Sequence, residues 1–210
     1  MKITIANQKG GAGKTTHCML FANYLTLEKS KEVLVLDLDF QSTIKATWDE
    51  DREKFDNDPL YEVLDLDLDQ SAALKKKLEN VNGYCIIDLP GKMDDDNLVP
   101  VYQNSDLVIC PMKYDRKTFK ATHVFAQVVK AINPNLPIVF LPNEIDSRVK
   151  YLNKVECDTV LSEFGVMAPP ISRLVAYERI DTLDIPEGAK PELFRAYDFI
   201  YENYVTPVHK

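Results

Sequence analysis

A glycine-rich stretch near the start of the chain, NQKGGAGKTT at residues 7–16, limits the possible folds more than any other feature. A short apolar run at residues 2–7 precedes it, and a helical pattern at residues 15–27 follows it. Glycines between a strand and a helix let consecutive backbone N–H groups curl round an anion, while the positive end of the helix dipole points at the same place. The stretch therefore predicts a phosphate-binding loop at the carboxyl end of the first strand.

The end of this stretch fits the pattern GxxxxGK[ST] at Gly13, Lys14 and Thr15. The first glycine of the pattern is replaced by a glutamine, and a second lysine follows it. We expect Lys14 to bridge the β- and γ-phosphates of a nucleotide, the Thr15 hydroxyl to ligate Mg²⁺, and Thr16 to donate to the α-phosphate. An incidental glycine-rich turn is the alternative, and the order of strand, loop and helix argues against it.

Further short apolar runs have the composition of strands, and three later stretches have helical periodicity. Runs rich in Val, Ile and Leu with little polar alternation are typical of strands buried on both faces. Strands that alternate with helices predict a single α/β domain over residues 1–210, with a mostly parallel, doubly wound sheet in the three-layer α/β/α arrangement of P-loop NTPases. The predicted strands are residues 32–40, 84–90, 106–112 and 137–143, and the predicted helices are residues 117–132, 151–164 and 191–204.

Residues 42–82 fit this alternation least well. The sequence LDLDLD at residues 64–69 alternates in the manner of an edge strand, whereas LYEVL before it and SAALKKKLENV after it look helical. We favour a helical region with an acidic loop, and the edge strand is the alternative.

Three aspartates at predicted strand ends are candidates for metal binding and catalysis. Asp88 ends the apolar run in YCIIDLPG, where a phosphate loop commonly finds a second acid for magnesium, although it could instead cap the next loop. Asp37 and Asp39 are two residues apart, so they share one side of an extended chain end and are expected to face the nucleotide. A carboxylate beside the γ-phosphate can orient a water for in-line attack, which is the role that we assign to Asp39. Ordinary polar residues at a strand end are the alternative.

The motifs KGGAGKTT, DLDFQS and IIDLPG, in this order, resemble the deviant Walker A ATPases of the ParA/MinD family. The loop of that family reads KGGxGKT[ST], so the resemblance implies that Lys9 reaches across a nucleotide-sandwiched homodimer to the partner's phosphates, like an arginine finger supplied in trans. It implies ATP and Mg²⁺ as cofactors, and Lys9, Lys14 and Asp39 as the catalytic set. Nucleotide contacts are implied at Gly10, Gly11, Ala12, Gly13, Lys14, Thr15, Thr16 and, beside the adenine, Asn143 of FLPNEIDSR; metal contacts are implied at Thr15, Asp39 and Asp88.

Other parts of the chain match this family less closely. YEVL at residues 61–64 resembles its short helix after the second strand, and PPISRLVAYERI resembles a late segment that places Arg173 at the family's arginine. Phe40 and Gly91 stand where the family often has prolines. The acidic run at residues 94–96 is interpreted as a solvated loop, and it could instead weaken ATP binding or select a basic partner. Because the chain begins at its first strand, it resembles the short partition ATPases that lack an N-terminal helix-turn-helix.

The resemblance implies a partition-type ATPase for plasmids or chromosomes. ATP and Mg²⁺ would close the dimer, the closed dimer would bind DNA without sequence preference, and a DNA-bound, ParB-like partner would stimulate slow hydrolysis in a cytoplasmic, nucleoid-associated setting. The net charge of -8 and the pI of about 5.0 disfavour nucleic acid and anionic lipid, so DNA binding needs a local basic face. The candidates are Lys117, Lys120, Arg148, Lys150 and Arg173, and solvated helix and loop ends are the alternative.

Three other functions stay open. A MinD-like positioning or assembly ATPase usually ends in a basic membrane helix, but the helix predicted at residues 191–204 carries Asp198 and Glu202 and looks packed. A mobile-element ATPase, such as one serving conjugation, would use the same switch on another cargo. An ATP-dependent ligase of the same superfamily, such as dethiobiotin synthetase, needs a substrate site, and the sequence shows no second cluster of convergent polar residues.

The remaining composition argues against several other classes. No apolar run approaches the roughly 20 residues of a membrane helix. The four cysteines lack metal-site spacing and are predicted to be buried thiols, so a shared iron–sulfur cluster is not expected. The three histidines form no pattern, and we assign them no chemistry.

Overall fold

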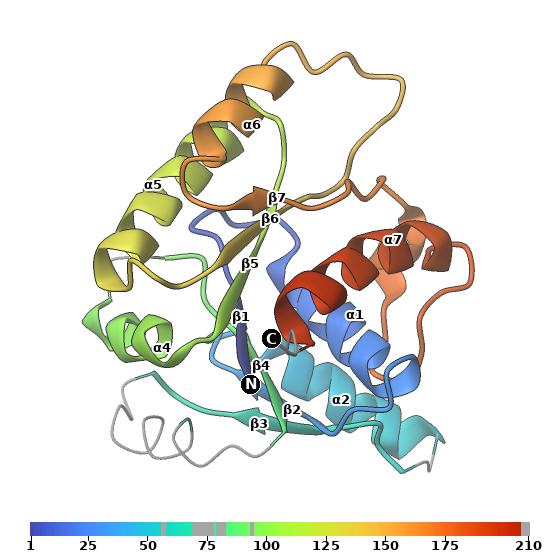
Figure 1. The fold of residues 1–210 in the computed structure, drawn as a ribbon. Helices are drawn as coiled ribbons and strands as arrows, with labels where there is room; N and C mark the ends of the chain where they lie inside the picture. The colour runs from blue at the N-terminus through green and yellow to red at the C-terminus, as the bar shows by residue number, and fades with distance from the viewer. Residues whose placement is uncertain (56–57, 69–77, 79–82, 93–94, 207–210) are drawn as a thin grey trace.

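The computed structural model describes residues 1–55, 58–68, 78, 83–92 and 95–206. Its strands form one seven-stranded sheet in the order β3-β2-β4-β1-β5-β6-β7, in which all neighbours are parallel (Figure 1). The predicted parallel α/β sheet is thus confirmed, with β1 at its centre. The strands are β1 Lys2–Ile5, β2 Val33–Asp37, β3 Glu62–Asp65, β4 Tyr84–Asp88, β5 Leu107–Met112, β6 Ile138–Pro142 and β7 Val166–Met167.

Helices cover both faces of the sheet, which gives the predicted three layers. In Figure 1, α1, α2 and α7 lie on one side of the sheet, and α4, α5 and α6 lie on the other. Each side has its own cluster of buried apolar residues. The helices are α1 Lys14–Leu27, α2 Thr43–Phe55, α4 Val99–Asn104, α5 Arg116–Ile132, α6 Lys154–Leu161 and α7 Lys190–Ile200, with short turns η1 Asp96–Leu98, η2 Val175–Arg179 and η3 Tyr201–Val205.

The central strands explain why their sequences lack polar alternation. All six residues of β5 are buried, and successive side chains enter opposite clusters: Ile109 packs with α1 and α7, whereas Cys110 packs with α4 and α5. A parallel strand covered on both faces must be apolar along its whole length. This buried centre holds the ends of β1, β2 and β4 in fixed register, with Asp88 opposite both Ile5 and Asp37.

The region between β2 and β4 differs from the prediction. α2 is helical as expected, but residues 62–64 of YEVL belong to β3 and not to a short helix, because Glu62–Asp65 pairs with β2 from Leu34 to Asp37. Val63 is buried on the side of α1 and Leu64 packs on the side of α4, while Glu62 and Asp65 are exposed, so the segment forms an edge strand. The edge-strand alternative for residues 64–65 is therefore correct. The helix predicted at residues 71–81 lies outside the described residues apart from Leu78, and so does Asp94 of the acidic run.

The last described helix packs onto the body of the protein. Leu193, Tyr197 and Ile200 of α7 are fully buried, and Asp198 accepts hydrogen bonds from Tyr24 and Lys29 of the α1 region at 2.5 and 2.7 Å. The expectation of a packed helix at this position is confirmed. In the described part of the chain, no helix combines the length and the apolar character needed to cross a bilayer.

Candidate functional site

The phosphate loop, residues 6–13, leaves β1 at the carboxyl edge of the sheet. β1 lies between β4 and β5, so connections leave for opposite sides here, and parallel α/β sheets bind ligands at such points. Gly11 and Gly13 have φ values of 72° and 99°, a region that side chains other than glycine rarely adopt. A Cβ on Gly13 would also lie 2.3 Å from Nδ2 of Asn143. Two independent constraints therefore require glycine at position 13.

Asn7 anchors the start of the loop, a role that the sequence analysis did not assign. Its buried Nδ2 donates to the Pro111 carbonyl and to Oγ1 of Thr122, both at 2.8 Å, and its Oδ1 accepts from the Lys9 backbone N–H at 3.0 Å. These bonds tie the loop to β5 and α5. The available signal was the position of Asn7, at the end of the first apolar run and three residues before Gly10.

A cavity of about 520 Å³ opens over the loop. Its lining brings together most of the predicted contact residues and adds Gln41 and Gly91, which the sequence analysis had not named as contacts although both lie in its motifs. Ala12 is buried within the loop, and the lining does not include Lys9, Asp88 or Asn143. The lining residues are Gly10, Gly11, Gly13, Lys14, Thr15, Thr16, Asp39, Gln41 and Gly91.

Gly91 allows the segment after β4 to approach the loop closely. A Cβ at this position would lie 3.2 Å from Nζ of Lys14 and 3.5 Å from the backbone N of Gly10. Lys14 itself is only 7% exposed, so its ammonium has little freedom to move aside. The departure from the family's proline at this position therefore has a local steric reason.

Thr15 and Asp88 meet at the floor of the site. The Thr15 hydroxyl donates to Oδ2 of Asp88 at 2.7 Å, and Oδ1 of Asp88 is buried with no partner among the described residues. Burial raises the pKa of Asp88 to about 7; the nearby charge of Asp37 adds to this rise, and the Thr15 bond opposes it. An unpaired carboxylate oxygen beside a hydroxyl suits a hard cation such as Mg²⁺. Within the described ranges no three ionisable side chains are grouped to hold a metal, so phosphate and water oxygens would have to complete its shell.

Asp37 and Asp39 have different surroundings, contrary to the expectation that both face the nucleotide. Oδ2 of Asp37 accepts from the backbone N–H groups of Ile44 and Lys45 at 3.0 and 3.1 Å, and its side chain is fully buried. Asp37 thus satisfies the free N–H groups at the start of α2, as an N-cap residue does. Asp39 is half-buried and lies in the cavity wall, so only the second aspartate is available to a nucleotide.

Sequence and fold comparisons agree with this site. Residues 3–182 match the CbiA family, the CobQ/CobB/MinD/ParA nucleotide binding domain. The chain belongs to this family.

The fold is also similar to solved structures at low sequence identity. A Borrelia burgdorferi B31 protein bound to AMPPNP has a TM-score of 0.76 at 20% identity, covering 96% of this chain and 98% of that one. A plasmid partition protein from Borrelia burgdorferi has a TM-score of 0.73 at 21% identity, with the same coverage. A McdA variant from Cyanothece in complex with ATP has a TM-score of 0.72 at 18% identity, covering 96% and 95%. No curated protein sequence matches the chain.

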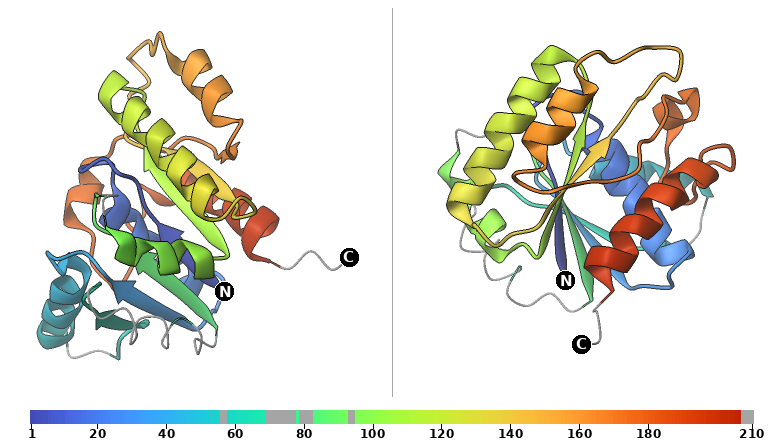
Figure 2. Two further views of the ribbon diagram at one scale, coloured as in Figure 1. Left: turned by 90° about the vertical axis from the view of Figure 1, so that its left-hand side faces the viewer. Right: turned by 45° about the horizontal axis from the view of Figure 1, so that its top comes forward.

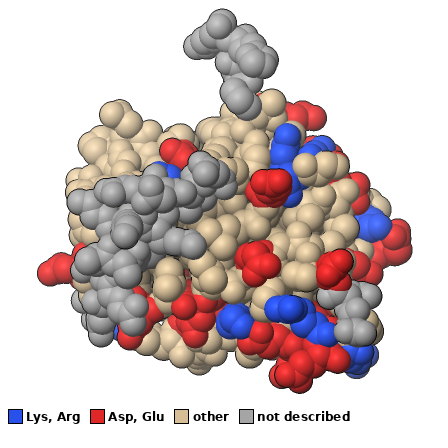
Figure 3. Space-filling model, turned by 90° about the horizontal axis from the view of Figure 1, so that it is seen from below, with Lys and Arg blue, Asp and Glu red and all other residues tan. Residues whose placement is uncertain are grey.

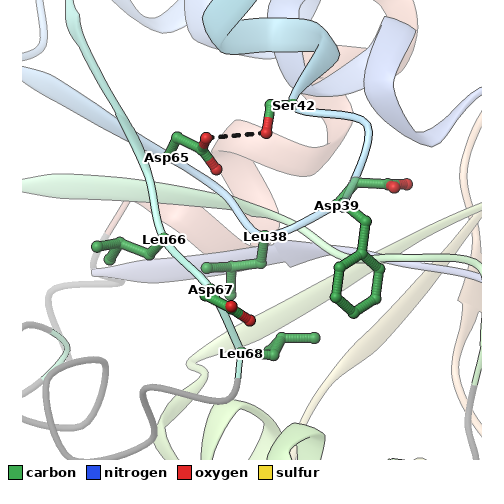
Figure 4. Close-up of a pocket in the computed structure, with 8 residues that line it drawn as sticks. Leu38, Asp39, Ser42, Asp65, Leu66, Asp67 and Leu68 are labelled. Carbon is green, nitrogen blue, oxygen red and sulfur yellow. Dashed lines mark hydrogen bonds between the residues drawn. The ribbon is translucent and has the colours of Figure 1, made fainter.

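A second cavity, of about 340 Å³, borders the nucleotide cavity of this ParA/MinD-type domain at Asp39. Figure 4 shows it between the segment after β2 and the segment after β3, with the Asp39 carboxylate pointing away from Asp65 and Asp67. Ser42 donates to Asp65 at 2.9 Å. This is a second polar cluster close to the phosphate site, which the sequence analysis had not found. β3 creates it, so a helix at residues 61–64 would have removed it.

Phe40 joins the segments that follow β2 and β4. Its side chain is 59% exposed, and Nζ of Lys92 lies 4.3 Å from the centre of its ring. A cation over an aromatic face is a favourable contact at this distance. The phenylalanine in place of the family's proline thus supplies a link between the two acidic strand ends.

The residues predicted to bind DNA lie beyond the ends of β5, β6 and β7. Arg148 and Arg173 line a third cavity of about 470 Å³, where Arg148 forms a two-bond ion pair with Asp146 at 2.9 and 2.7 Å. Lys117 and Lys120 are exposed on α5, and Lys150 is exposed after β6. Figure 3 views the side of β3 and α2, where basic and acidic side chains are interspersed without a broad basic area among the described residues. Of the five predicted residues, the structure brings only Arg148 and Arg173 to one cavity.

The cysteines and one histidine complete the description. Cys18, Cys85, Cys110 and Cys157 are free and buried, as predicted. His17, to which we had assigned no chemistry, is fully enclosed, and its Nδ1 lies 2.7 Å from the hydroxyl of Tyr197. Burial lowers the pKa of His17 to about 4, so the ring is neutral near pH 7.

Proposed function

We propose that this protein is a ParA-type ATPase that uses ATP-dependent dimerisation as a switch for the partition of DNA. The observation that carries the proposal is the arrangement at the centre of the sheet. Lys14, Thr15, Asp88 and Asp39 surround one site, while Lys9 on the outer part of the same loop forms no ion pair with any described residue. A lysine left without a counter-ion beside a phosphate site suits a phosphate of a second protomer.

Hydrolysis would use side chains already in place. The Asp39 carboxylate would orient a water and accept its proton as the water oxygen attacks the γ-phosphorus and the bond to the β–γ bridging oxygen breaks. Lys14 would neutralise the charge that develops on that oxygen. Mg²⁺, held through Thr15 and Asp88, would supply further positive charge to the phosphates. Lys9 of the partner subunit would complete the site only in the closed dimer, so ATP hydrolysis would depend on dimer formation.

DNA binding would follow from dimer formation. A chain with a net charge of -8 repels a duplex overall, so its basic residues must act together. Arg148 and Arg173 share one cavity wall, and Lys117, Lys120 and Lys150 are exposed in the segments beyond the same half of the sheet. Two copies would double this charge along one surface. A DNA-bound partner protein could then release the dimer from DNA by stimulating hydrolysis.

The test is duplex-DNA binding by the Asp39→Ala variant with MgATP and with MgADP over a salt series. This variant should hold ATP without hydrolysing it, so the closed dimer should accumulate and bind DNA only with ATP, with an affinity that falls steeply as salt rises. The matched control is the Asp39→Ala, Lys9→Ala double variant, which should bind ATP but stay monomeric in sedimentation. An ATP-bound dimer without affinity for DNA would remove DNA as the track, and ATP turnover indifferent to Lys9→Ala would remove the role in trans.

A MinD-like positioning or assembly ATPase with a different track is the second candidate. Exposed apolar side chains favour it: Val149, Leu152 and Val155 are 50%, 86% and 78% exposed around the start of α6, next to Lys150 and Lys154. Such a mixture suits a protein or membrane surface better than DNA. Flotation of the Asp39→Ala variant with liposomes, with and without ATP, separates this candidate from the first.

The acidic cavity argues against a ligase of the same superfamily. Enzymes of that kind activate a carboxylate substrate beside the γ-phosphate. Here Asp39, Asp65 and Asp67 line the space next to that position, and they would repel a carboxylate. A mobile-element ATPase that uses the same switch on another cargo would be unaffected by this repulsion.

A further inference from the structure

A row of buried polar groups runs under the phosphate loop from the last helix of the described chain. Tyr197 on α7 contacts His17 on α1 through the hydroxyl–Nδ1 contact of 2.7 Å. On the other side of the loop, Nδ2 of Asn143 donates to the Ala12 carbonyl at 3.0 Å. Figure 1 and the right-hand view of Figure 2 show α7 lying alongside α1, which makes the first of these contacts possible.

The two halves of this row, Tyr197 with His17 and Asn143 with Ala12, each present a buried atom without a hydrogen-bond partner. Nε2 of His17 and Oδ1 of Asn143 are shielded from water and have no hydrogen bond of normal geometry with the described residues. The two side chains approach the same point, because a Cβ on Gly13 would lie 2.3 Å from Nδ2 of Asn143 and 3.5 Å from Cδ2 of His17.

The chemistry of the groups fixes one consistent pairing. If the Tyr197 hydroxyl donates to Nδ1, the neutral ring carries its proton on Nε2, and Nε2–H is a donor. Oδ1 of Asn143 is then the matching acceptor. With the proton on Nδ1 instead, the lone pair of Nε2 would face that oxygen and two buried acceptors would stay unpaired, which proteins avoid.

We propose that Tyr197, His17 and Asn143 form one buried hydrogen-bonded chain that positions the phosphate loop through Ala12. This proposal rests on the nucleotide-binding role of the loop and assigns Asn143 to the loop instead of to the adenine. It makes Tyr197 and His17 positioning residues, which touch no nucleotide atom. Nucleotide affinity would therefore depend on a hydroxyl of α7, 180 residues along the chain from its partner on α1.

The test compares two tyrosine-to-phenylalanine variants for binding of MgATP, MgGTP and inorganic tripolyphosphate with Mg²⁺. Tyr197→Phe keeps the ring and removes the hydroxyl that fixes the tautomer. Tyr177→Phe is the matched control, because the buried Tyr177 hydroxyl has no hydrogen-bond partner among the described residues. We expect Tyr197→Phe to weaken all three ligands by the same factor, about three- to tenfold, and Tyr177→Phe to leave all three affinities at the wild-type value.

Asn143→Ala separates positioning of the loop from recognition of the base. A positioning role predicts an equal loss for ATP, GTP and tripolyphosphate. A loss for ATP alone, or a Tyr197→Phe variant that binds tripolyphosphate as tightly as the Tyr177→Phe control, would overturn the proposal. Circular dichroism and the unfolding midpoint check that each variant is folded, and Tyr197→Phe carries the test if Asn143→Ala is not. A wild-type protein that bound no MgATP would instead remove the proposed function.

Discussion

The phosphate loop and the segment between β2 and β4 teach opposite lessons about how this sequence determines its structure. The backbone angles of the loop are determined locally: Gly11 and Gly13 occupy angles that other residues avoid, and the helix that follows starts at Lys14. β3 is determined by its partner, since Glu62–Asp65 becomes a strand by pairing with β2. A motif whose geometry depends on its own residues can be read from sequence, whereas a segment whose state depends on a neighbour cannot.

The largest expected effect lies at Asp88, where the two regions meet in the register of β1, β2 and β4. Its pKa is about 7 in the folded protein and about 4 when unfolded, so the folded form keeps a proton that the unfolded form has lost. Stability should therefore fall as pH rises from about 4 to about 7 and then level off, by at most about 4 kcal/mol. Asp88→Asn should remove this fall. Urea unfolding at pH 5 and pH 8, without Mg²⁺ or nucleotide, measures it, and equal pH dependence in both proteins would contradict the assignment.

The second prediction concerns the loop alone. Gly13→Ala should weaken MgATP binding roughly a hundredfold or more, because its Cβ would meet Nδ2 of Asn143 at 2.3 Å and its φ of 99° would be strained by about 1–2 kcal/mol. Gly188→Ala is the control, since Gly188 lies outside the cavity and no atom lies within 4 Å of its added Cβ. Isothermal titration measures both. Similar losses in the two variants would show that the loop is not governed by this local geometry.

These two regions also show how much of the site could be predicted. The three motifs brought Lys14, Thr15 and Asp39 to one cavity and Thr15 to Asp88, because each motif ends a buried strand and all these ends meet at one edge of the sheet. The contacts of Asp37 with α2, and of His17 with Tyr197, were not predictable. The first depends on how α2 starts against the end of β2, and the second on how α1 and α7 pack together, which no spacing along the chain encodes.

The third prediction tests β3, the segment whose sequence pattern had been interpreted as helical. Val63→Ala should destabilise the protein by about 2 kcal/mol, because Val63 is 1% exposed and its neighbours cannot fully close the space. Glu62→Ala should change stability by less than about 0.5 kcal/mol, since its side chain is exposed at the sheet edge. The free energy of unfolding in urea measures both. Equal effects at the two positions would argue against the alternation of a strand.

The smallest expected effect lies at the contact between the segments after β2 and β4. The ring of Phe40 and the ammonium of Lys92 are both exposed, so water competes for the charge and the contact should be worth only about 0.5–1 kcal/mol. Phe40→Ala, Lys92→Met and the double variant form a thermodynamic cycle whose coupling energy isolates this term from changes in packing. The cycle should give a larger coupling energy with MgATP than without it if nucleotide draws the two segments together at Asp39 and Gly91. A coupling energy of zero under both conditions would mean that the segments after β2 and β4 act independently at this contact.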